Sequence, residues 1–185
     1  RLGAIDIVSA ADVDAVAITA ASLQQQAGSG TTTLDGAINT DGAAGVSLTG
    51  TNLALNNSLT TTNAGTVTVT QSGTATLAAD GDITADGAVS LTATGGITTA
   101  GDITTTADNI TLSSATTLTD DVAMSTGATG GTITFSSTLD GTTAGQEDLT
   151  LTAGTGDIAF DGAVGDSTRL GAIDIVSAAD VDAKA

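Results

Sequence analysis

The chain contains no proline, cysteine, tryptophan, tyrosine or histidine, and its only aromatic residues are Phe135 and Phe160. Without cysteine there is no disulfide framework. A globular domain of 185 residues normally fills its core with aromatic side chains, so this composition indicates another architecture. Hydrophobic residues make up 40% of the chain and recur periodically, which excludes a disordered segment.

The missing residue types also argue against an enzyme. General acid–base catalysis near neutral pH most often uses histidine, and nucleophilic triads depend on it as well. Nucleotide-binding and zinc-binding motifs are absent from the sequence. The pairs Asp80/Asp82 and Asp120/Asp121 have the residue types of a glycoside hydrolase. Solenoid hydrolases also need aromatic and basic residues in a substrate groove, so we predict no enzymatic activity.

Positive charge is nearly absent too. The basic residues Arg1, Arg169 and Lys184 face 21 acidic residues, which gives a net charge of −18. This charge argues against partners such as nucleic acids and anionic membrane surfaces. No apolar run reaches the length of about 18 residues that a membrane-spanning helix requires, so we expect no membrane span in this segment.

What the chain does have is repetition. The sequence RLGAIDIVSAADVDAVA at residues 1–17 returns as RLGAIDIVSAADVDAKA at residues 169–185, with only Val16 and Lys184 differing. The offset is 168 residues. Near-copies in tandem are typical of elongated repeat proteins. We therefore expect residues 1–168 to form one repeat unit of about eight coils, and residues 169–185 to begin the next unit of a single continuous solenoid.

A shorter period lies inside the long one. Pairs of apolar residues separated by one residue recur at Ile5/Ile7, Val46/Leu48, Val67/Val69, Val89/Leu91, Ile110/Leu112, Ile133/Phe135, Leu149/Leu151 and Ile173/Ile175. From Val46 to Ile133 the steps are 21, 22, 21 and 23 residues, whereas the step to Leu149 is shorter and the next is longer. With a degraded pair at Leu23/Gln25 included, the coils average 21 residues.

Each coil has the pattern of β-strands. Alternation puts Val67 and Val69 on one face and the threonines beside them on the other. Six Asp-Gly dipeptides, which favour tight turns and positive φ, separate such segments at positions 35–36, 41–42, 80–81, 86–87, 140–141 and 161–162. The best helical candidate, residues 10–26, also matches two short strands. We predict an all-β chain, a parallel β-solenoid with a triangular cross-section.

The spacing of the acidic residues suggests a candidate metal site. An aspartate precedes isoleucine or valine at Asp82, Asp102, Asp121, Asp157 and Asp180. In coils stacked about 4.8 Å apart, these carboxylates would form a column along one corner. Ca²⁺, which prefers oxygen ligands, would relieve their repulsion and is the one cofactor we consider. The glycine-rich nonapeptide of calcium-binding β-rolls is absent. The alternative is that aspartate forms turns and provides solubility.

The outward residues suggest a candidate binding face. Hydroxyl pairs flank the inward pairs at Ser47/Thr49, Thr68/Thr70, Ser90/Thr92, Thr111/Ser113, Thr134/Ser136 and Thr150/Thr152. Stacked coils would turn them into a flat array of the kind that ice-binding solenoids carry. Serine substitutions and Asp174 at an equivalent place weaken this interpretation. The alternative is that threonine is simply a good solvent-facing strand residue.

Longer segments resemble a known class of protein. The phrases LTLTAGTGDIAFDGAVGDSTRLGAIDI (149–175), ITFSSTLDGTTAG (133–145) and QQQAGSGTTTLDGAINTDGAAGVSLTGTNLAL (24–55) are similar to repeats of giant bacterial surface proteins. These are the filamentous-haemagglutinin-type exoproteins and autotransporter-like adhesins. The resemblance implies a right-handed parallel β-helix, secretion to the cell surface, and a role as a stalk, fibre or adhesin. It supplies no catalytic residues.

Together these features predict a right-handed parallel β-solenoid that forms an extracellular fibre or stalk at a bacterial surface. Such a fibre would support adhesion or a surface layer. We expect its partner to be itself, head-to-tail along the axis, with lateral bundling as a further mode. The alternative is a binding module that uses the outward threonines and aspartates for a receptor, calcium or ice. In either case the predicted inward residues include Ile110, Leu112, Ile133, Phe135, Leu149 and Leu151.

Overall fold

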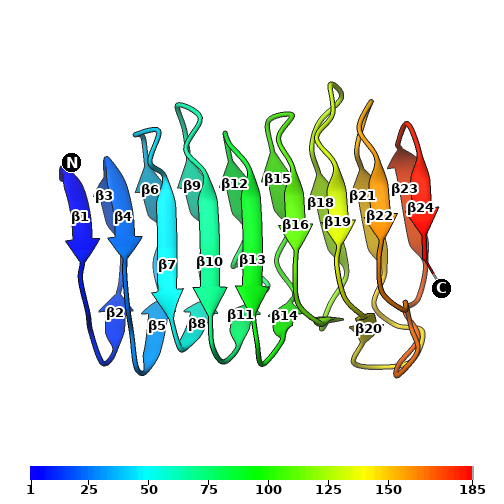
Figure 1. Cartoon of the computed structure of the whole chain (residues 1–185), viewed down its shortest axis with the longest axis horizontal. Helices are drawn as coiled ribbons and strands as arrows, with labels where there is room; N and C mark the ends of the chain where they lie inside the picture. Colours follow the sequence, from blue (N-terminus) through cyan, green and yellow to red (C-terminus); the bar gives the residue numbers. More distant parts are fainter. Residues whose placement is uncertain (185) are drawn as a thin grey trace.

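The computed structural model describes residues 1–184, so Ala185, the last residue of the second near-copy, lies outside the described residues. Over these residues the chain forms 24 β-strands and no helix. No helix capable of crossing a membrane is therefore found among the described residues. The strands follow one another around an axis, coil on coil, from one end of the molecule to the other (Figure 1). The predicted all-β solenoid is confirmed.

Three parallel sheets make up the three sides. The nine-stranded face contains β1 (Ala4–Ile7), β4 (Ser22–Gln25), β7 (Val46–Gly50), β10 (Val67–Gln71), β13 (Val89–Ala93), β16 (Ile110–Leu112), β19 (Ile133–Phe135), β22 (Ile158–Phe160) and β24 (Val181–Ala183). The seven-stranded face contains β2 (Val13–Ala15), β5 (Thr31–Leu34), β8 (Asn52–Leu55), β11 (Ala75–Leu77), β14 (Ile97–Thr99), β17 (Thr116–Leu118) and β20 (Leu139–Gly141). The eight-stranded face contains β3 (Ile18–Ala20), β6 (Ile38–Thr40), β9 (Leu59–Thr61), β12 (Ile83–Ala85), β15 (Ile103–Thr105), β18 (Val122–Ser125), β21 (Leu149–Thr152) and β23 (Ile173–Ser177).

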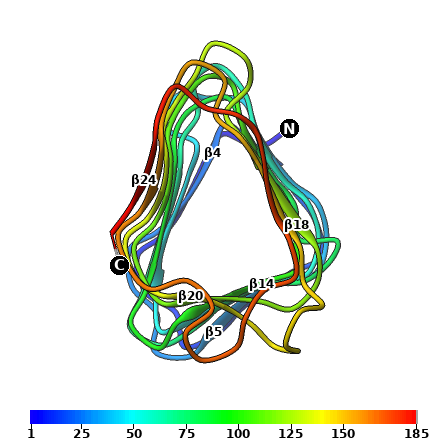
Figure 2. The ribbon, with the colours of Figure 1, turned by 90° about the vertical axis from the view of Figure 1, so that its right-hand side faces the viewer.

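Seen along the axis, the three faces enclose a triangle (Figure 2). The chain visits the nine-, seven- and eight-stranded faces in that order in each coil. In Figure 1 the near strands run downward while the chain advances from left to right, which makes the coil right-handed. The right-handed triangular solenoid expected from the sequence is thus the observed fold.

The core is a narrow column inside the triangle. In β10, Val67 and Val69 are at most 1% exposed, whereas Thr68 and Thr70 between and beside them face the solvent. The six predicted inward residues are all fully buried, at 1% exposure or less. Each aliphatic side chain buried in this way contributes about 1.5–3 kcal/mol, which explains how a core with two aromatic residues is sufficient.

The average coil is longer than the apolar pairs indicate. Along the nine-stranded face, the paired positions run from Ile5 to Val181, which is 176 residues in eight coils, or 22 per coil. The apolar pairs give an average of only 21 because that count places Leu149 and Leu151 on the same face as Ile133. These two residues belong to β21 on the eight-stranded face. The pair that continues the nine-stranded face is Ile158/Phe160 in β22.

The two near-copies consequently lie on different faces. Residues 4–7 form β1 on the nine-stranded face, whereas their copies in residues 172–175 lead into β23 on the eight-stranded face. Likewise β2 lies on the seven-stranded face and its copy β24 on the nine-stranded face. The 168-residue unit therefore spans seven and two-thirds coils, which is close to the expected eight.

Five of the six Asp-Gly dipeptides lie at corners, whereas Asp140-Gly141 lies at the end of β20, and the glycines serve a different purpose than expected. None of their six glycines is among those with positive φ in the described residues. Instead the glycine allows close contact between neighbouring coils. A Cβ on Gly36 would lie 1.0 Å from the carbonyl oxygen of Val16, and one on Gly81 would lie 2.4 Å from that of Leu55. Positive φ is found at other corner residues, such as Gly45 (57°), which also contacts the next coil.

Candidate functional site

Three of the predicted aspartates form a ladder along one corner. Asp82, Asp102 and Asp121 each directly precede a strand of the eight-stranded face. The backbone N–H of Asp102 donates to Oδ1 of Asp82 (2.8 Å), and that of Ala123 donates to Oδ1 of Asp102 (2.7 Å). Each carboxylate therefore accepts a hydrogen bond from the backbone of the following coil, which ties one coil to the next.

A fourth aspartate extends this ladder. The N–H of Asp148 donates to Oδ1 of Asp121 (2.8 Å), and Oδ1 of Asp148 accepts from the N–H of Ala172 (2.5 Å). The sequence pattern missed Asp148 because it required isoleucine or valine to follow the aspartate, and Asp148 is followed by Leu149. An aspartate before any inward apolar pair is the pattern that would have found it.

The other two predicted aspartates lie elsewhere. Asp157 and Asp180 precede β22 and β24, so they occupy the corner that leads into the nine-stranded face. Oδ1 of Asp180 accepts from the N–H of Val181 in its own coil (2.9 Å). The five predicted residues therefore occupy two corners, with Asp82, Asp102 and Asp121 in one column and Asp157 and Asp180 in adjacent coils at the other.

The hydrogen bonds of the ladder join neighbouring coils. A shallow depression of about 310 Å³ is lined by Asp102, Asp121, Val122, Ala123, Asp148 and Thr150. Within residues 1–184, however, no three acidic, histidine or cysteine side chains converge in a way that could hold a metal ion. The same inter-coil bond recurs at other corners, where Asp12 accepts from the N–H of Thr31 (2.8 Å) and Asn109 from that of Thr132 (2.8 Å).

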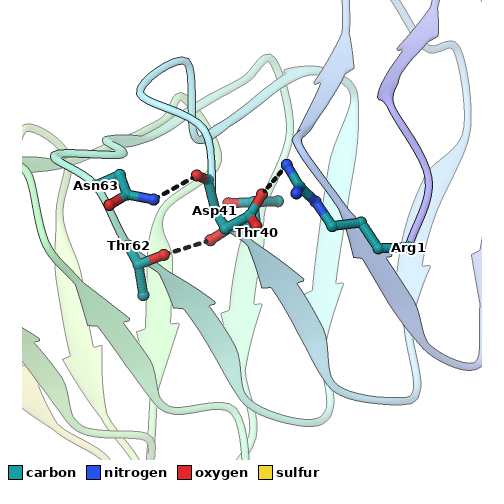
Figure 3. Close-up of polar contacts among 5 residues, drawn as sticks. All are labelled: Arg1, Thr40, Asp41, Thr62 and Asn63. Carbon is teal, nitrogen blue, oxygen red and sulfur yellow. Dashed lines mark hydrogen bonds and ion pairs between the residues drawn. The ribbon is translucent and has the colours of Figure 1, made fainter.

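A second polar cluster lies near the start of the chain, at the corner after β6 (Figure 3). Nη2 of Arg1 lies 2.6 Å from Oδ1 of Asp41, and Nδ2 of Asn63 donates to the carbonyl oxygen of Asp41 (2.7 Å). Oδ1 of Asp41 has no well-aligned hydrogen bond in the described residues, so its contact with Arg1 is an ion pair. Both side chains are more than a third exposed, which limits such a pair to about 1 kcal/mol or less.

A buried threonine adjoins that cluster. Thr40 is 3% exposed, and its Oγ1 has no hydrogen-bond partner in the described part of the chain. Two threonines at the same end of later strands do have partners, because Thr126 Oγ1 donates to the carbonyl oxygen of Gly131 (2.9 Å) and Thr61 Oγ1 to that of Gly65 (2.5 Å). These inward hydroxyls hold the corner loop, a role that the apolar pairs alone do not indicate.

The single glutamate is also buried. Glu147, in the loop between β20 and β21, is 5% exposed. Its carboxylate accepts hydrogen bonds from Oγ1 of Thr142 (2.6 Å) and from the N–H of Thr143 (2.9 Å). The Thr142 bond is the main reason why the pKa of Glu147 lies below its usual value, although burial acts in the opposite direction. Sequence reasoning did not single out this residue.

The outward hydroxyls form columns on two faces. Five of the six predicted pairs lie on the nine-stranded face, whereas Thr150/Thr152 lies on the eight-stranded face. The register of the eight-stranded face aligns one outward residue from each strand, namely Thr19, Asn39, Thr60, Thr84, Thr104, Ser125, Thr152 and Ser177. This hydroxyl column is interrupted only by Asn39. The corresponding column of the nine-stranded face includes Asp6, Gln24, Ala159 and Asp182.

The apolar surface lies at the two ends of the solenoid. The large hydrophobic side chains that are exposed in the described residues are Leu2, Val8 and Val16 in the first coil, and Val164, Ile173, Val176 and Val181 in the last. A depression of about 560 Å³ at the last coil is lined by residues that include Phe160, Val164 and Ala183. The edges of all three sheets also end there and at the first coil. The strongest candidate for a contact surface therefore lies at the two ends of the solenoid axis.

Comparisons with protein-family models, with curated proteins and with solved structures each found no match to this chain.

Proposed function

We propose that this chain is part of an extracellular structural fibre, a stalk in which β-solenoid coils continue end to end. The observation that carries this proposal is the division of its surface. Polar residues cover the three sides, whereas exposed apolar side chains and unpaired strand edges are concentrated at both ends. Unpaired edges favour pairing with further strands, and apolar patches mark contact surfaces.

The internal bonding suits a load-bearing rod. Each coil is joined to the next by parallel hydrogen bonding in three sheets, by side-chain bonds such as the aspartate ladder, and by the continuous apolar column. The near-copy of the first coil at the far end supplies the repetition that a long fibre needs. The net charge of −18 of the chain would oppose nonspecific lateral contacts between such rods.

The extracellular location is part of the same proposal. It is supported by the similarity of residues 24–55, 133–145 and 149–175 to repeats of giant bacterial surface proteins. In that setting the fibre holds an adhesive tip away from the cell or contributes to a surface layer.

The test is whether the molecule associates along its axis. We expect sedimentation and electron microscopy to show rods that lengthen with concentration at constant width. Val181→Asp, on the exposed edge strand β24, should weaken this association. The matched control Ala159→Asp adds the same charge on the outward side of β22 and should leave it intact. A monomer that makes no axial contact at any concentration would contradict the proposal.

The hydroxyl column of the eight-stranded face favours a second candidate, a binding module. A flat row of hydroxyls repeated about every 4.8 Å could bind a glycan receptor or ice. Thr84→Lys and Thr104→Lys interrupt that row, whereas Thr98→Lys places the same charge on the seven-stranded face. Loss of glycan binding or of ice shaping in the first two variants alone would support this candidate, and an equal response in all three would exclude it.

A further inference from the structure

The repeated segment of residues 1–16 and 169–184 lies on different faces of the solenoid in its two copies, and every strand of the copy is displaced in the same way. Ile5 in β1 lies on the nine-stranded face, and its copy Ile173 in β23 lies on the eight-stranded face. We infer that successive 168-residue units of a fibre are related by one third of a turn about its axis, so that an array of this chain forms a threefold screw. This inference rests on the proposed function, because it concerns the fibre that such units build.

The rotation by one third of a turn follows from the order of the strands along the chain. Seven complete coils lead along the nine-stranded face from Ile5 to Ile158 in β22. The chain then crosses the seven-stranded face, where Leu139 forms an isolated bridge with Val164, before it reaches Ile173. The copy therefore begins two thirds of a coil after the seventh complete coil.

A second pair of strands shows the same shift. Val13 in β2 lies on the seven-stranded face, and its copy Val181 in β24 pairs with Ile158 on the nine-stranded face. Seven coils and two further faces separate these strands, as they do the first pair. The one-third turn is thus a property of the whole near-copy and not of a single irregular strand.

The structure also contains the junction between units. Since residues 169–184 nearly repeat residues 1–16, the contacts of β23 and β24 represent those of a following unit with the preceding one. Ile173 pairs with Leu149 and Ile175 with Leu151, before the register shifts at the end of β21. Each face requires only an apolar pair that points inward, so the same strand sequence fits either face.

The depression at the last coil indicates where the following unit continues. In a second unit, residues 18–20 follow the copied segment, and the order of the faces in each coil takes them to the seven-stranded face. Ile18 of that unit would then cover Val164 and Phe160, which both line the depression of about 560 Å³. In the present unit Ile18 instead lies on the eight-stranded face.

The rotation between units determines the axial repeat of the fibre and the directions in which its lateral features point. Three units, 504 residues, complete 23 coils and return each residue to its starting face. At about 4.8 Å per coil the repeat distance along the axis is about 110 Å, with about 37 Å per unit. Every lateral feature, such as the hydroxyl column or the loop that protrudes after β20 in Figure 2, then points in three directions about 120° apart.

Cysteine pairs in the present chain test the junction, because the chain has no cysteine of its own. Thr150 and Asp174 are register partners in adjacent coils, a separation that a disulfide can span. We expect T150C/D174C to form an intramolecular disulfide in nearly all molecules under mild oxidation. If the copy returned to the nine-stranded face, Asp174 would instead pair with Ala159, so A159C/D174C is the matched alternative. Its preferential oxidation would overturn the inference.

A three-unit chain tests the screw itself. Residues 1–168 are joined in tandem three times before residues 169–185, and a peptide tag bound by a small antibody fragment is inserted between Ala144 and Gly145 of each unit. In electron micrographs we expect the fragments about 37 Å apart in three directions, and fragments in one line would overturn the inference. A three-unit chain no longer than one unit would instead contradict the proposed fibre. The comparison of the two cysteine pairs would still show on which face the copy lies.

Discussion

Phe135 and Phe160 stack with parallel rings in adjacent coils, with ring centroids 5.4 Å apart and an interplanar angle of 5°. They are register partners on the nine-stranded face, and the next residue in their column is Ala183. The only two aromatic rings of the chain thus lie together near its C-terminal end. Phe135 is enclosed on both sides by neighbouring coils, whereas Phe160 borders the depression at the last coil.

This arrangement predicts unequal effects of truncation. Phe135→Ala leaves a cavity within a closed column and should lower the free energy of unfolding by about 3–5 kcal/mol. Phe160→Ala opens toward the end of the stack, where the last coil can adjust, and should cost clearly less. Urea unfolding of both variants, monitored by circular dichroism, measures the difference. Equal losses would mean that the last coil is as tightly enclosed as the interior.

Ile133→Asp tests the inward and outward alternation of β19. Ile133 is fully buried, so the variant places an unpaired carboxylate in the apolar column and should destabilise the fold by several kcal/mol. Thr134→Asp puts the same group on the outward side of the same strand and should change stability by less than about 1 kcal/mol. Thermal melting of the two variants gives the comparison, and similar melting temperatures would contradict the observed register.

Gly36→Ala tests the close contact between coils at an Asp-Gly corner. The new Cβ would lie 1.0 Å from the carbonyl oxygen of Val16, and a backbone atom in this position cannot move without displacing its coil. We expect a large drop in melting temperature and faster hydrogen exchange in the first two coils. Gly3→Ala is the matched control, because nothing lies within 4 Å of its added Cβ. A melting temperature unchanged in both variants would contradict the close approach of Gly36 to Val16.

Glu147 predicts a pH dependence with a defined sign. Because its pKa is lowered in the folded state, the ionised carboxylate stabilises the fold above the ordinary value of 4.5. That contribution is lost as the pH falls below 4.5 through the lower folded pKa. The melting temperature of the native protein should therefore exceed that of Glu147→Gln at pH 7, and the gap should narrow below about pH 4.5.

Two threonine variants check the cause of this dependence. Thr142→Val removes the hydroxyl that donates to Glu147. In this background the difference in melting temperature between Glu147 and Glu147→Gln should be smaller at neutral pH. Thr143→Val retains its backbone N–H donor and should behave like the native protein. An equal response to the two substitutions would show that the Thr142 hydroxyl is not the main cause of the lowered pKa.

The aspartate ladder predicts a weak response to calcium. Its carboxylates already accept backbone hydrogen bonds, so melting curves in Ca²⁺, in Na⁺ of matched ionic strength and in chelator should coincide once screening is equal. Asp102→Asn retains an acceptor oxygen and should nearly preserve stability, whereas Asp102→Ala should cost about 1–2 kcal/mol. A rise in melting temperature specific to Ca²⁺, and blunted in Asp102→Asn, would show binding instead.

The fold was predictable because the apolar pairs determine which residues point inward. Val67 and Val69 or Ile133 and Phe135 satisfy that pattern, and the structure buries them all. Which face a pair occupies was not predictable, because Leu149/Leu151 and Ile133/Phe135 have the same local pattern on different faces. Coil lengths also vary. On the nine-stranded face they range from 18 residues between Ile5 and Leu23 to 25 between Ile133 and Ile158, so counting residues along the chain does not show which face a strand occupies.

The candidate site was predictable in part for a related reason. Asp82, Asp102 and Asp121 share a column because their coils are of similar length and the strands they precede lie on one face. Asp157 has the same local sequence pattern but precedes a strand of another face. The burial of Glu147 depends on a loop conformation that brings Thr142 to its carboxylate, and no periodic pattern encodes that loop.

The coil-on-coil contacts also determine how the molecule would respond to tension. Strands pair only with strands of the adjacent coils, so a force applied to the two chain ends would detach terminal coils one after another while the remaining stack stays folded. Each detached coil of 22 residues releases about 75 Å of extended chain. A stalk of this kind would lengthen stepwise under shear and dissipate energy at each step instead of breaking.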